Sequence, residues 1–195
     1  MKGSNRRKVG GGIWLVGTVV VLVLGALVGW LAGAFQREAR QEFDRLLDRA
    51  WDLHEAGRYQ EMEALGRKLL QMAEGPLRGT PEFRAAALNT LGVALLEQGQ
   101  LQEAEALLKE ALAIRRKQLG PEHPRVALSL NNLANLYRDM GRFQEAEPLY
   151  KEALAIKRKQ LGPEHPHVAA SLNNLATLYR DMGRFQEAEP LLKEA

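Results

Sequence analysis

Residues 126–153 read VALSLNNLANLYRDMGRFQEAEPLYKEA, and residues 168–195 read VAASLNNLATLYRDMGRFQEAEPLLKEA. The second stretch repeats the first at an offset of 42 in the numbering, and the two differ at only three positions. A looser copy, RAAALNTLGVALLEQGQLQEAEALLKEA, occupies residues 84–111, and a degenerate copy lies within 43–74. Self-similarity at a fixed period of this length indicates a repeat array, in which each unit buries its apolar face against its neighbours.

Each repeat has the pattern of two helices. In the copy that starts at residue 126, four apolar residues have the i, i+3, i+4, i+7 spacing of one helix face: Leu130, Leu133, Ala134 and Tyr137. Gly141 ends this helix, because glycine readily adopts the left-handed backbone of a turn. A second apolar set runs from Ala146 to Ile156, and the LGPEHP sequence of 161–166 ends it with one glycine and two prolines. We therefore predict an all-α fold of helix pairs.

The large and small residues of the copies resemble the tetratricopeptide repeat pattern. The matching residues are Leu130, Leu133, Ala134, Tyr137, Ala146, Tyr150 and Ala153, with their equivalents one period before and after. The 42-residue period and the LGPEHP linker are similar to the subclass found in kinesin light chains and in many bacterial repeat proteins. This resemblance implies a right-handed α-solenoid. The first copy departs from the pattern at Arg49 and Gly66, where large apolar residues are expected.

The sequence divides into six segments. These are a basic flank (1–12), a transmembrane helix (13–35), juxtamembrane helices with a degenerate repeat (36–83), two repeats (84–125 and 126–167) and an incomplete last repeat (168–195). The linker that follows the same point one period earlier is absent after residue 195. We therefore expect the array to continue in a longer protein. A natural short end that self-associates is the alternative.

Residues 13–35, IWLVGTVVVLVLGALVGWLAGAF, predict a membrane-spanning helix. The stretch has no charged residue, and as a helix it would be about 34 Å long, against a bilayer core of about 30 Å. Trp14 and Trp30 lie near its two ends, where indole rings suit the membrane interface. A cleaved signal peptide is the alternative, because Ala32-Gly33-Ala34 resembles a cleavage site. The apolar region of a signal peptide is typically shorter, however, at about 7–15 residues.

Basic residues near this segment predict its orientation. The N-terminal flank carries Lys2, Arg6, Arg7 and Lys8 and no acid. Residues 36–50 carry as many arginines, diluted by acids and less closely packed against the membrane. We expect a single-pass protein with its N-terminus in the cytoplasm and its repeats on the far side, which in the bacterial inner membrane is the periplasm.

Three glycines within the apolar segment share one helix face. Gly25, Gly29 and Gly33 recur at every fourth position, a spacing that lets two membrane helices approach closely. This pattern predicts a homodimer through the membrane helix. The ordinary glycine richness of membrane helices is the alternative explanation.

The composition provides little for catalysis. The chain has no cysteine, which excludes thiolate metal sites and a cysteine nucleophile. Ser129 and Ser171 occupy the same repeat position, which makes a special nucleophile implausible, and Glu145 and Glu147 fit a solvated helix face. Four of the 27 basic residues lie in the N-terminal flank, leaving 23 against 24 acidic residues, so we expect no nucleic-acid partner. We predict no catalytic residue, no metal site and no cofactor.

The concave surface of the solenoid is the predicted peptide-binding site. Its candidate residues lie on the first helix of each repeat, away from the packed face: Asn89, Asn131, Asn132, Asn135, Arg138, Asn173, Asn174, Thr177 and Arg180. Asparagine is disfavoured inside helices, so two adjacent asparagines that recur at the repeat period need a reason. A side-chain amide both donates and accepts hydrogen bonds, and the resemblance implies that such asparagines hold an extended peptide. Inter-repeat packing is the alternative role.

We therefore expect a membrane-tethered interaction scaffold that binds a peptide or a partner protein. Two alternatives stay open at this point. The chain is the anchor and recruitment part of a longer enzyme or signalling protein that continues past residue 195, or it is a secreted repeat protein after signal cleavage.

Overall fold

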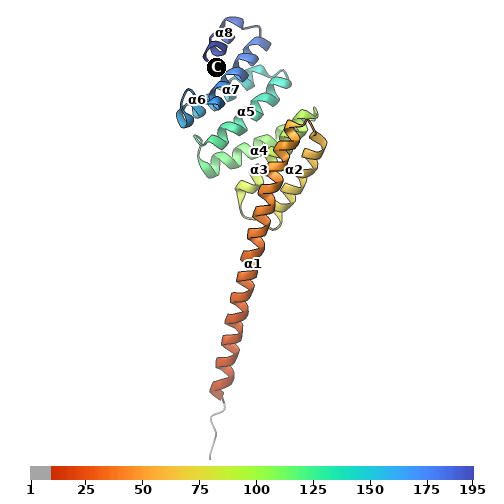
Figure 1. Cartoon of the computed structure of the whole chain (residues 1–195), viewed down its shortest axis with the longest axis vertical. Coiled ribbons are helices and arrows are strands. Elements are labelled where there is room, and N and C mark those ends of the chain that lie inside the picture. Colours follow the sequence, from red (N-terminus) through yellow and green to blue (C-terminus); the bar gives the residue numbers. More distant parts are fainter. Residues whose placement is uncertain (1–9) are drawn as a thin grey trace, which may run out of the picture. The chain divides into compact units, whose positions relative to one another are not determined.

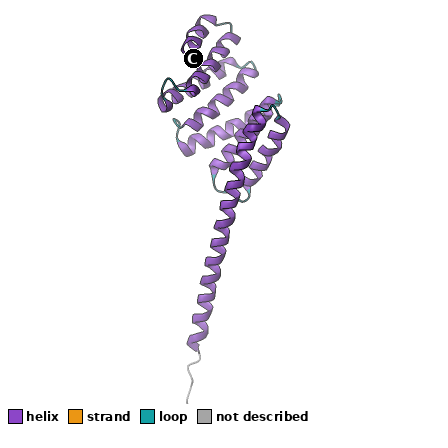
Figure 2. Cartoon of the chain, in the orientation of Figure 1, coloured by secondary structure: helices purple, strands orange, loops and turns teal. Residues whose placement is uncertain are grey.

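The computed structural model describes the backbone of residues 10–195 and the side chains from Val28 onward. All regular structure in this part of the chain is helical (Figure 2), as predicted. The helices are α1 (Gly10–Glu55), α2 (Tyr59–Glu74), α3 (Pro81–Glu97), α4 (Leu101–Leu119), α5 (Pro124–Asp139), α6 (Phe143–Leu161), α7 (Pro166–Asp181) and α8 (Phe185–Glu194).

The chain forms two compact units, residues 1–42 and residues 43–195. Within the second unit, α2 to α8 pack in chain order, each helix against the next (Figure 1). The pairs α3–α4, α5–α6 and α7–α8 are the three clear repeats, and the end of α1 with α2 forms the degenerate one. The second unit is therefore a helical repeat solenoid, which confirms the predicted helix pairs.

Alternating small and large side chains form the core of the solenoid. Ala134, Ala146 and Ala153 are fully buried, and so is the much larger Tyr150. The alanines let neighbouring helices approach closely, and the large residues fill the space between them. The repeat pattern of the sequence is thus a packing pattern.

The turns follow from glycine and from the linker histidines. Gly141 and Gly183 have φ values of +71° and +73°, a left-handed backbone that suits glycine. His123 and His165 precede α5 and α7, and their Nδ1 atoms accept hydrogen bonds at 3.1 Å from the backbone N–H groups of residues 125 and 167. The proline of each His-Pro pair then takes the first helical position, where no N–H is needed.

The surroundings of Arg49 and Gly66 explain why the degenerate first repeat departs from the repeat pattern at these two positions. Arg49 is exposed, on the side of the array where no repeat precedes it within the described residues. Gly66 is buried at the contact between α2 and α3. A Cβ atom there would lie only 2.9 Å from the Cα of Leu91. Glycine at this position therefore lets the backbones of the two helices approach more closely than any other residue would allow.

A surface pocket of about 640 Å³ lies beside this first repeat. Helix α2 has 16 residues, whereas α4 and α6 have 19, so α2 ends about one turn early and leaves space between its end, α3 and α4. The lining residues include Glu74, Arg78, Arg84, Glu110, Ile114 and Lys117. None of the predicted binding residues lines this pocket.

The N-terminal unit holds the first part of α1. The side chains of the predicted membrane segment 13–35 are described only from Val28, so its first part, Gly25 included, lies outside the described residues. In the remainder, Val28, Trp30, Leu31 and Phe35 are all exposed, and a Cβ atom on Gly29 would meet no atom within 4 Å. Within the described part of the chain, no helix is long and apolar enough to cross a membrane.

Candidate binding face of the repeats

Side-chain amides link the first helices of neighbouring repeats. The Nδ2 atom of Asn132 donates to Oδ1 of Asn89 at 3.1 Å, and Nδ2 of Asn174 donates to Oδ1 of Asn131 at 2.9 Å. Each bond joins the second asparagine of one repeat to the first asparagine of the repeat before it. We call these two bonds the amide ladder. The ladder shows why two adjacent asparagines recur, because the middle pair bonds in both directions, with Asn132 donating to the repeat before it and Asn131 accepting from the repeat after it.

The ladder leaves hydrogen-bonding capacity unused. A side-chain amide has two N–H donors and an oxygen with two lone pairs, and each ladder bond uses one of each. Asn131, Asn132 and Asn174 are only partly buried, so a ligand can reach the remaining groups. We call the side of the first helices that carries these amides, together with Asn135, Arg138 and their repeat equivalents, the ladder face.

Asn135 and Arg138 are held by contacts within the protein. The hydroxyl of Tyr150 donates to Oδ1 of Asn135 at 2.5 Å, and burial raises the pKa of Tyr150 to about 12. The guanidinium of Arg138 lies 3.0 Å from Oδ1 of Asp139 and 3.9 Å from Oδ2 of Asp181. These two predicted site residues therefore also tie α5 to α6 and α7.

The equivalent residues of the last repeat are more accessible. The hydroxyl of Thr177 donates to the backbone oxygen of Asn173 at 2.9 Å. The side chains of Asn173 and Arg180 are exposed, and neither has a hydrogen bond or an ion pair with another described residue. Of the predicted residues, these two are therefore the most available to a ligand.

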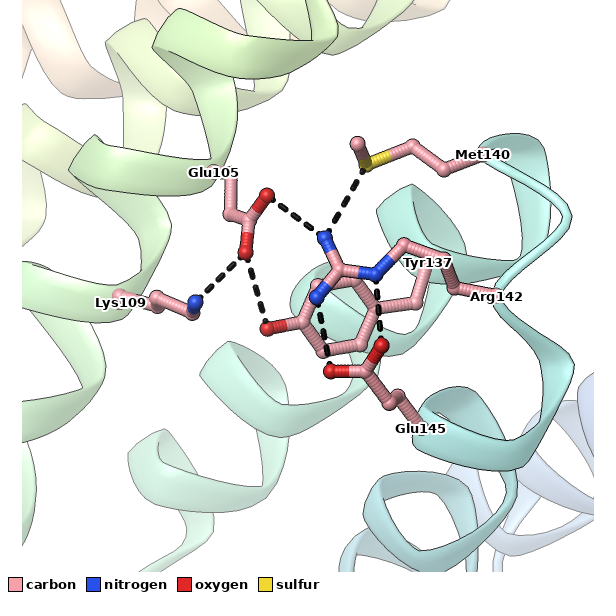
Figure 3. Close-up of polar contacts among 6 residues, drawn as sticks. All are labelled: Glu105, Lys109, Tyr137, Met140, Arg142 and Glu145. Atoms are coloured by element: carbon pink, nitrogen blue, oxygen red, sulfur yellow. Dashed lines mark hydrogen bonds and ion pairs between the residues drawn. The ribbon is translucent and has the colours of Figure 1, made fainter.

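A second polar network joins neighbouring repeats. In Figure 3, Glu105 accepts hydrogen bonds from Lys109 at 2.5 Å, from the hydroxyl of Tyr137 at 3.3 Å and from Arg142 at 2.8 Å. Arg142 also donates to Glu145 at 2.7 Å and stacks 4.2 Å from the centre of the Tyr137 ring. We call this set, with its equivalent one period later, the ionic cluster.

The second copy of the ionic cluster is built around Glu147. Its carboxylate accepts from Lys151 at 2.6 Å, from Arg184 at 2.6 Å and from Tyr179 at 3.1 Å. The hydrogen bond from Lys151, with those from Arg184 and Tyr179, lowers the pKa of Glu147 to about 2 against the effect of burial. The expectation that Glu145 and Glu147 form a solvated face was therefore wrong for Glu147. The sequence does contain a signal for this cluster, because Glu105, Tyr137 and Arg142 recur 42 residues later as Glu147, Tyr179 and Arg184.

A buried arginine and a partly buried lysine also bind the repeat that follows them. Arg115 donates to the hydroxyl of Ser129 at 2.7 Å and to the backbone oxygen of Arg125 at 3.3 Å, and burial lowers its pKa to about 10. Lys157 donates to the hydroxyl of Ser171 at 2.7 Å. The serines therefore bind the preceding repeat. Among the described residues, no three His, Cys, Asp or Glu side chains gather into a metal-binding group.

Comparison with known proteins establishes the family. The tetratricopeptide repeat model matches residues 83–159 and 127–195, which together are more than half of the chain. The chain belongs to the tetratricopeptide repeat family, whose members generally bind protein or peptide partners and are typically not enzymes. A search of the curated proteins finds no match.

Solved structures support the same assignment. A crystal structure of a Podospora anserina protein, described as a kinesin light chain with nearly identical TPR-like repeats, is 34% identical. The match covers 78% of this chain and 72% of that chain, with a TM-score of 0.69. BtubC (BKLC) from P. vanneervenii has the same fold at 20% identity, over 83% of this chain and 85% of that chain, with a TM-score of 0.59. The predicted repeat class, with kinesin-light-chain-like relatives, is confirmed.

Proposed function

We propose that this chain is a membrane-tethered scaffold that binds an extended segment of a partner protein along its ladder face. The observation that carries the proposal is the amide ladder. It fixes a row of asparagines in register over three repeats, and the partly exposed amides of Asn131, Asn132 and Asn174 keep donors and acceptors that no hydrogen bond with another described residue uses. A peptide backbone offers matching groups at regular intervals, so an extended segment suits this row.

The last repeat provides the most open part of the site. Asn173 occupies the same repeat position as Asn131, and its side-chain amide is available to hold the backbone of a ligand. Arg180 is an exposed guanidinium without an acidic partner among the described residues, and it suits a carboxylate on the bound segment. The other predicted asparagines contribute their unused amide groups, and Arg138 holds α5 against α7.

The proposed tether is the uncharged segment 13–35. Its support is the absence of charge over the whole segment and the exposure of Val28, Trp30, Leu31 and Phe35, which need an apolar environment. We place the N-terminus in the cytoplasm and the repeats on the periplasmic side of a bacterial inner membrane. The open space around Gly29 leaves room for a second membrane helix, so the tether is also the proposed dimer contact.

Replacing both Asn173 and Arg180 by alanine is expected to weaken ligand binding by about 1–3 kcal/mol, because the bound backbone and carboxylate lose their partners. The full-length chain in detergent micelles would first be used to select ligands from a phage-displayed library of random dodecapeptides. Isothermal titration calorimetry would then compare synthetic copies of the selected peptides on the wild type and the variant.

The matched control is a double variant of two exposed linker residues, Glu122→Ala with Glu164→Ala. Far-UV circular dichroism should show the same helicity and melting for all three proteins. Neither Asn173 nor Arg180 forms a side-chain hydrogen bond or ion pair with another described residue, and the pair of Glu122 with Lys159 is exposed and contributes little. Wild-type affinity of the Asn173/Arg180 variant for every selected peptide would remove these residues from the site and argue against the ladder face.

The tether is tested on cells that express the full-length chain with a C-terminal tag. We expect protease added to spheroplasts to digest the repeats, and mass spectrometry to find the intact N-terminus in the membrane fraction. Repeats protected until lysis would reverse the orientation. A mature chain that starts at Phe35 would show that the segment is a cleaved signal and that the repeats are secreted.

A further inference from the structure

An exposed tryptophan lies at the N-terminal end of the ladder face. Trp51, on α1, has the repeat position that Asn135 and Thr177 occupy two and three periods later. Its neighbour His54 has the position of Arg138, and Nε2 of His54 lies 3.8 Å from Glu97, as Arg138 lies 3.9 Å from Asp181. The two contacts span the same distance along the sequence, so the register of the ladder face extends back to α1.

Trp51 is held in place but is not covered. Its ring packs edge-on against the imidazole of His54 at a centroid distance of 5.9 Å, and His54 packs in the same way against Tyr59 at 5.9 Å. The side chain of Trp51 is nevertheless 52% exposed. A large exposed aromatic side chain on a proposed binding face is a candidate contact for the ligand.

Unpaired acids surround this tryptophan. Asp48 and Glu55 lie three residues before it and four residues after it, and therefore on the same side of α1. Neither forms an ion pair with another described residue. Two of the later equivalents of Glu55, Asp139 and Asp181, both lie against the guanidinium of Arg138. The ladder face is therefore acidic at the Trp51 end and has an unpaired cation, Arg180, at the other end.

Elsewhere in the protein, an aromatic ring beside a carboxylate holds a guanidinium group. In both copies of the ionic cluster a guanidinium stacks on an aromatic ring and pairs with a carboxylate, with Arg142 at 4.2 Å from the ring of Tyr137 and Arg184 at 4.4 Å from that of Tyr179. At Trp51 the ring and the carboxylates are present and, among the described residues, the chain provides no stacked cation. A cation over the face of an indole is the most favourable form of this interaction.

Building on the proposed function, we infer that Trp51 binds a lysine or arginine side chain of the partner segment, with Asp48 and Glu55 as its counter-ions. The bound segment then has a fixed direction. Its basic residue lies at the first repeat, and its acidic group lies at Arg180 in the last repeat. Charge complementarity at both ends of the ladder face selects this direction over the reverse one.

The test uses the peptides selected on the full-length chain, with Trp51→Leu, Trp51→Phe and the control Trp30→Leu. Trp30 is also an exposed tryptophan of α1, in the N-terminal unit. We expect the selected peptides to share a basic residue, and its replacement by neutral citrulline or norleucine to weaken binding about 5- to 10-fold. Trp51→Leu should weaken binding of the basic peptides by a similar factor and remove the preference over the neutral ones. The Trp51→Phe variant should keep most of the preference for basic peptides, and the Trp30→Leu variant should keep all of it.

The outcomes separate this inference from the proposed function. If binding depends on Asn173 and Arg180 but the peptides share no basic residue, or if Trp51→Leu binds like the wild type, the role of Trp51 is wrong and the ladder face stands. If Trp51→Leu weakens basic and neutral peptides equally, Trp51 is an apolar contact and the cation site is wrong. If no peptide depends on Asn173 and Arg180, both proposals fail.

Discussion

Replacing Gly66 by alanine is expected to lower the free energy of unfolding by about 2–3 kcal/mol. In an open helix the same change would add stability, since alanine exceeds glycine in helix propensity by about 1 kcal/mol. Here the new methyl group would lie 2.9 Å from the Cα and 3.1 Å from the backbone nitrogen of Leu91. A backbone cannot rotate away as a side chain can, so α2 and α3 must separate and the contacts around them loosen.

Urea unfolding of the full-length chain in mild detergent, followed by far-UV circular dichroism, measures this change. Gln71→Ala is the control, because Gln71 is an exposed residue of the same helix and its replacement should change stability little. Equal or greater stability of the Gly66→Ala variant would show that α2 and α3 are not in the close contact described here.

Gly66 also shows how far the sequence could define the fold. The 42-residue repetition and the helical spacing of Leu130, Leu133, Ala134 and Tyr137 were sufficient to predict helix pairs in a stacked array. They could only mark Gly66 as a departure from the pattern. The reason for glycine at position 66 is the close approach of the α3 backbone. The sequence around position 66 does not indicate how close another helix will lie.

The binding face was predictable in part for a similar reason. The recurrence of Asn131 and Asn132 at Asn173 and Asn174 placed them on one side of the first helix. It could not show that the bonds run between the second amide of one repeat and the first amide of the previous one, because a repeat pattern gives positions and not partners. Trp51 was missed because its repeat lacks the asparagines, so composition did not connect it to the others.

The ionic cluster and the amide ladder both hold neighbouring repeats at a fixed spacing. The cluster fixes one repeat against the next through Glu105 and Glu147, and the ladder lies on the first helices of those repeats. A ligand that spans several repeats needs their spacing to be constant. We therefore expect a loss of the cluster to lower stability first and to weaken binding of long segments as a consequence.

Replacing Glu147 by glutamine is expected to lower the free energy of unfolding by about 2–3 kcal/mol at pH 7. The folded pKa of about 2 lies below the ordinary value of 4.5, and each unit of pKa corresponds to about 1.4 kcal/mol. Because the folded pKa is the lower one, the carboxylate contributes its stability above pH 4.5 and loses it as the pH falls from 4.5 to 2. The side chain of Glu147 is only 18% exposed, so water screens these contacts little.

The matched control is Glu189→Gln, at the same position of the next repeat. Glu189 is 66% exposed, and its one ion pair with a described residue is to Lys193, four residues away. An exposed pair of this kind contributes about 0.3–0.5 kcal/mol. Urea unfolding at several pH values should therefore show a large difference between Glu147→Gln and the wild type at pH 7, which shrinks towards zero by pH 2, and a small difference for Glu189→Gln throughout. Equal effects of the two substitutions at pH 7 would mean that Tyr179 and Arg184 do not stabilise the Glu147 carboxylate, and that the ionic cluster does not join the last two repeats.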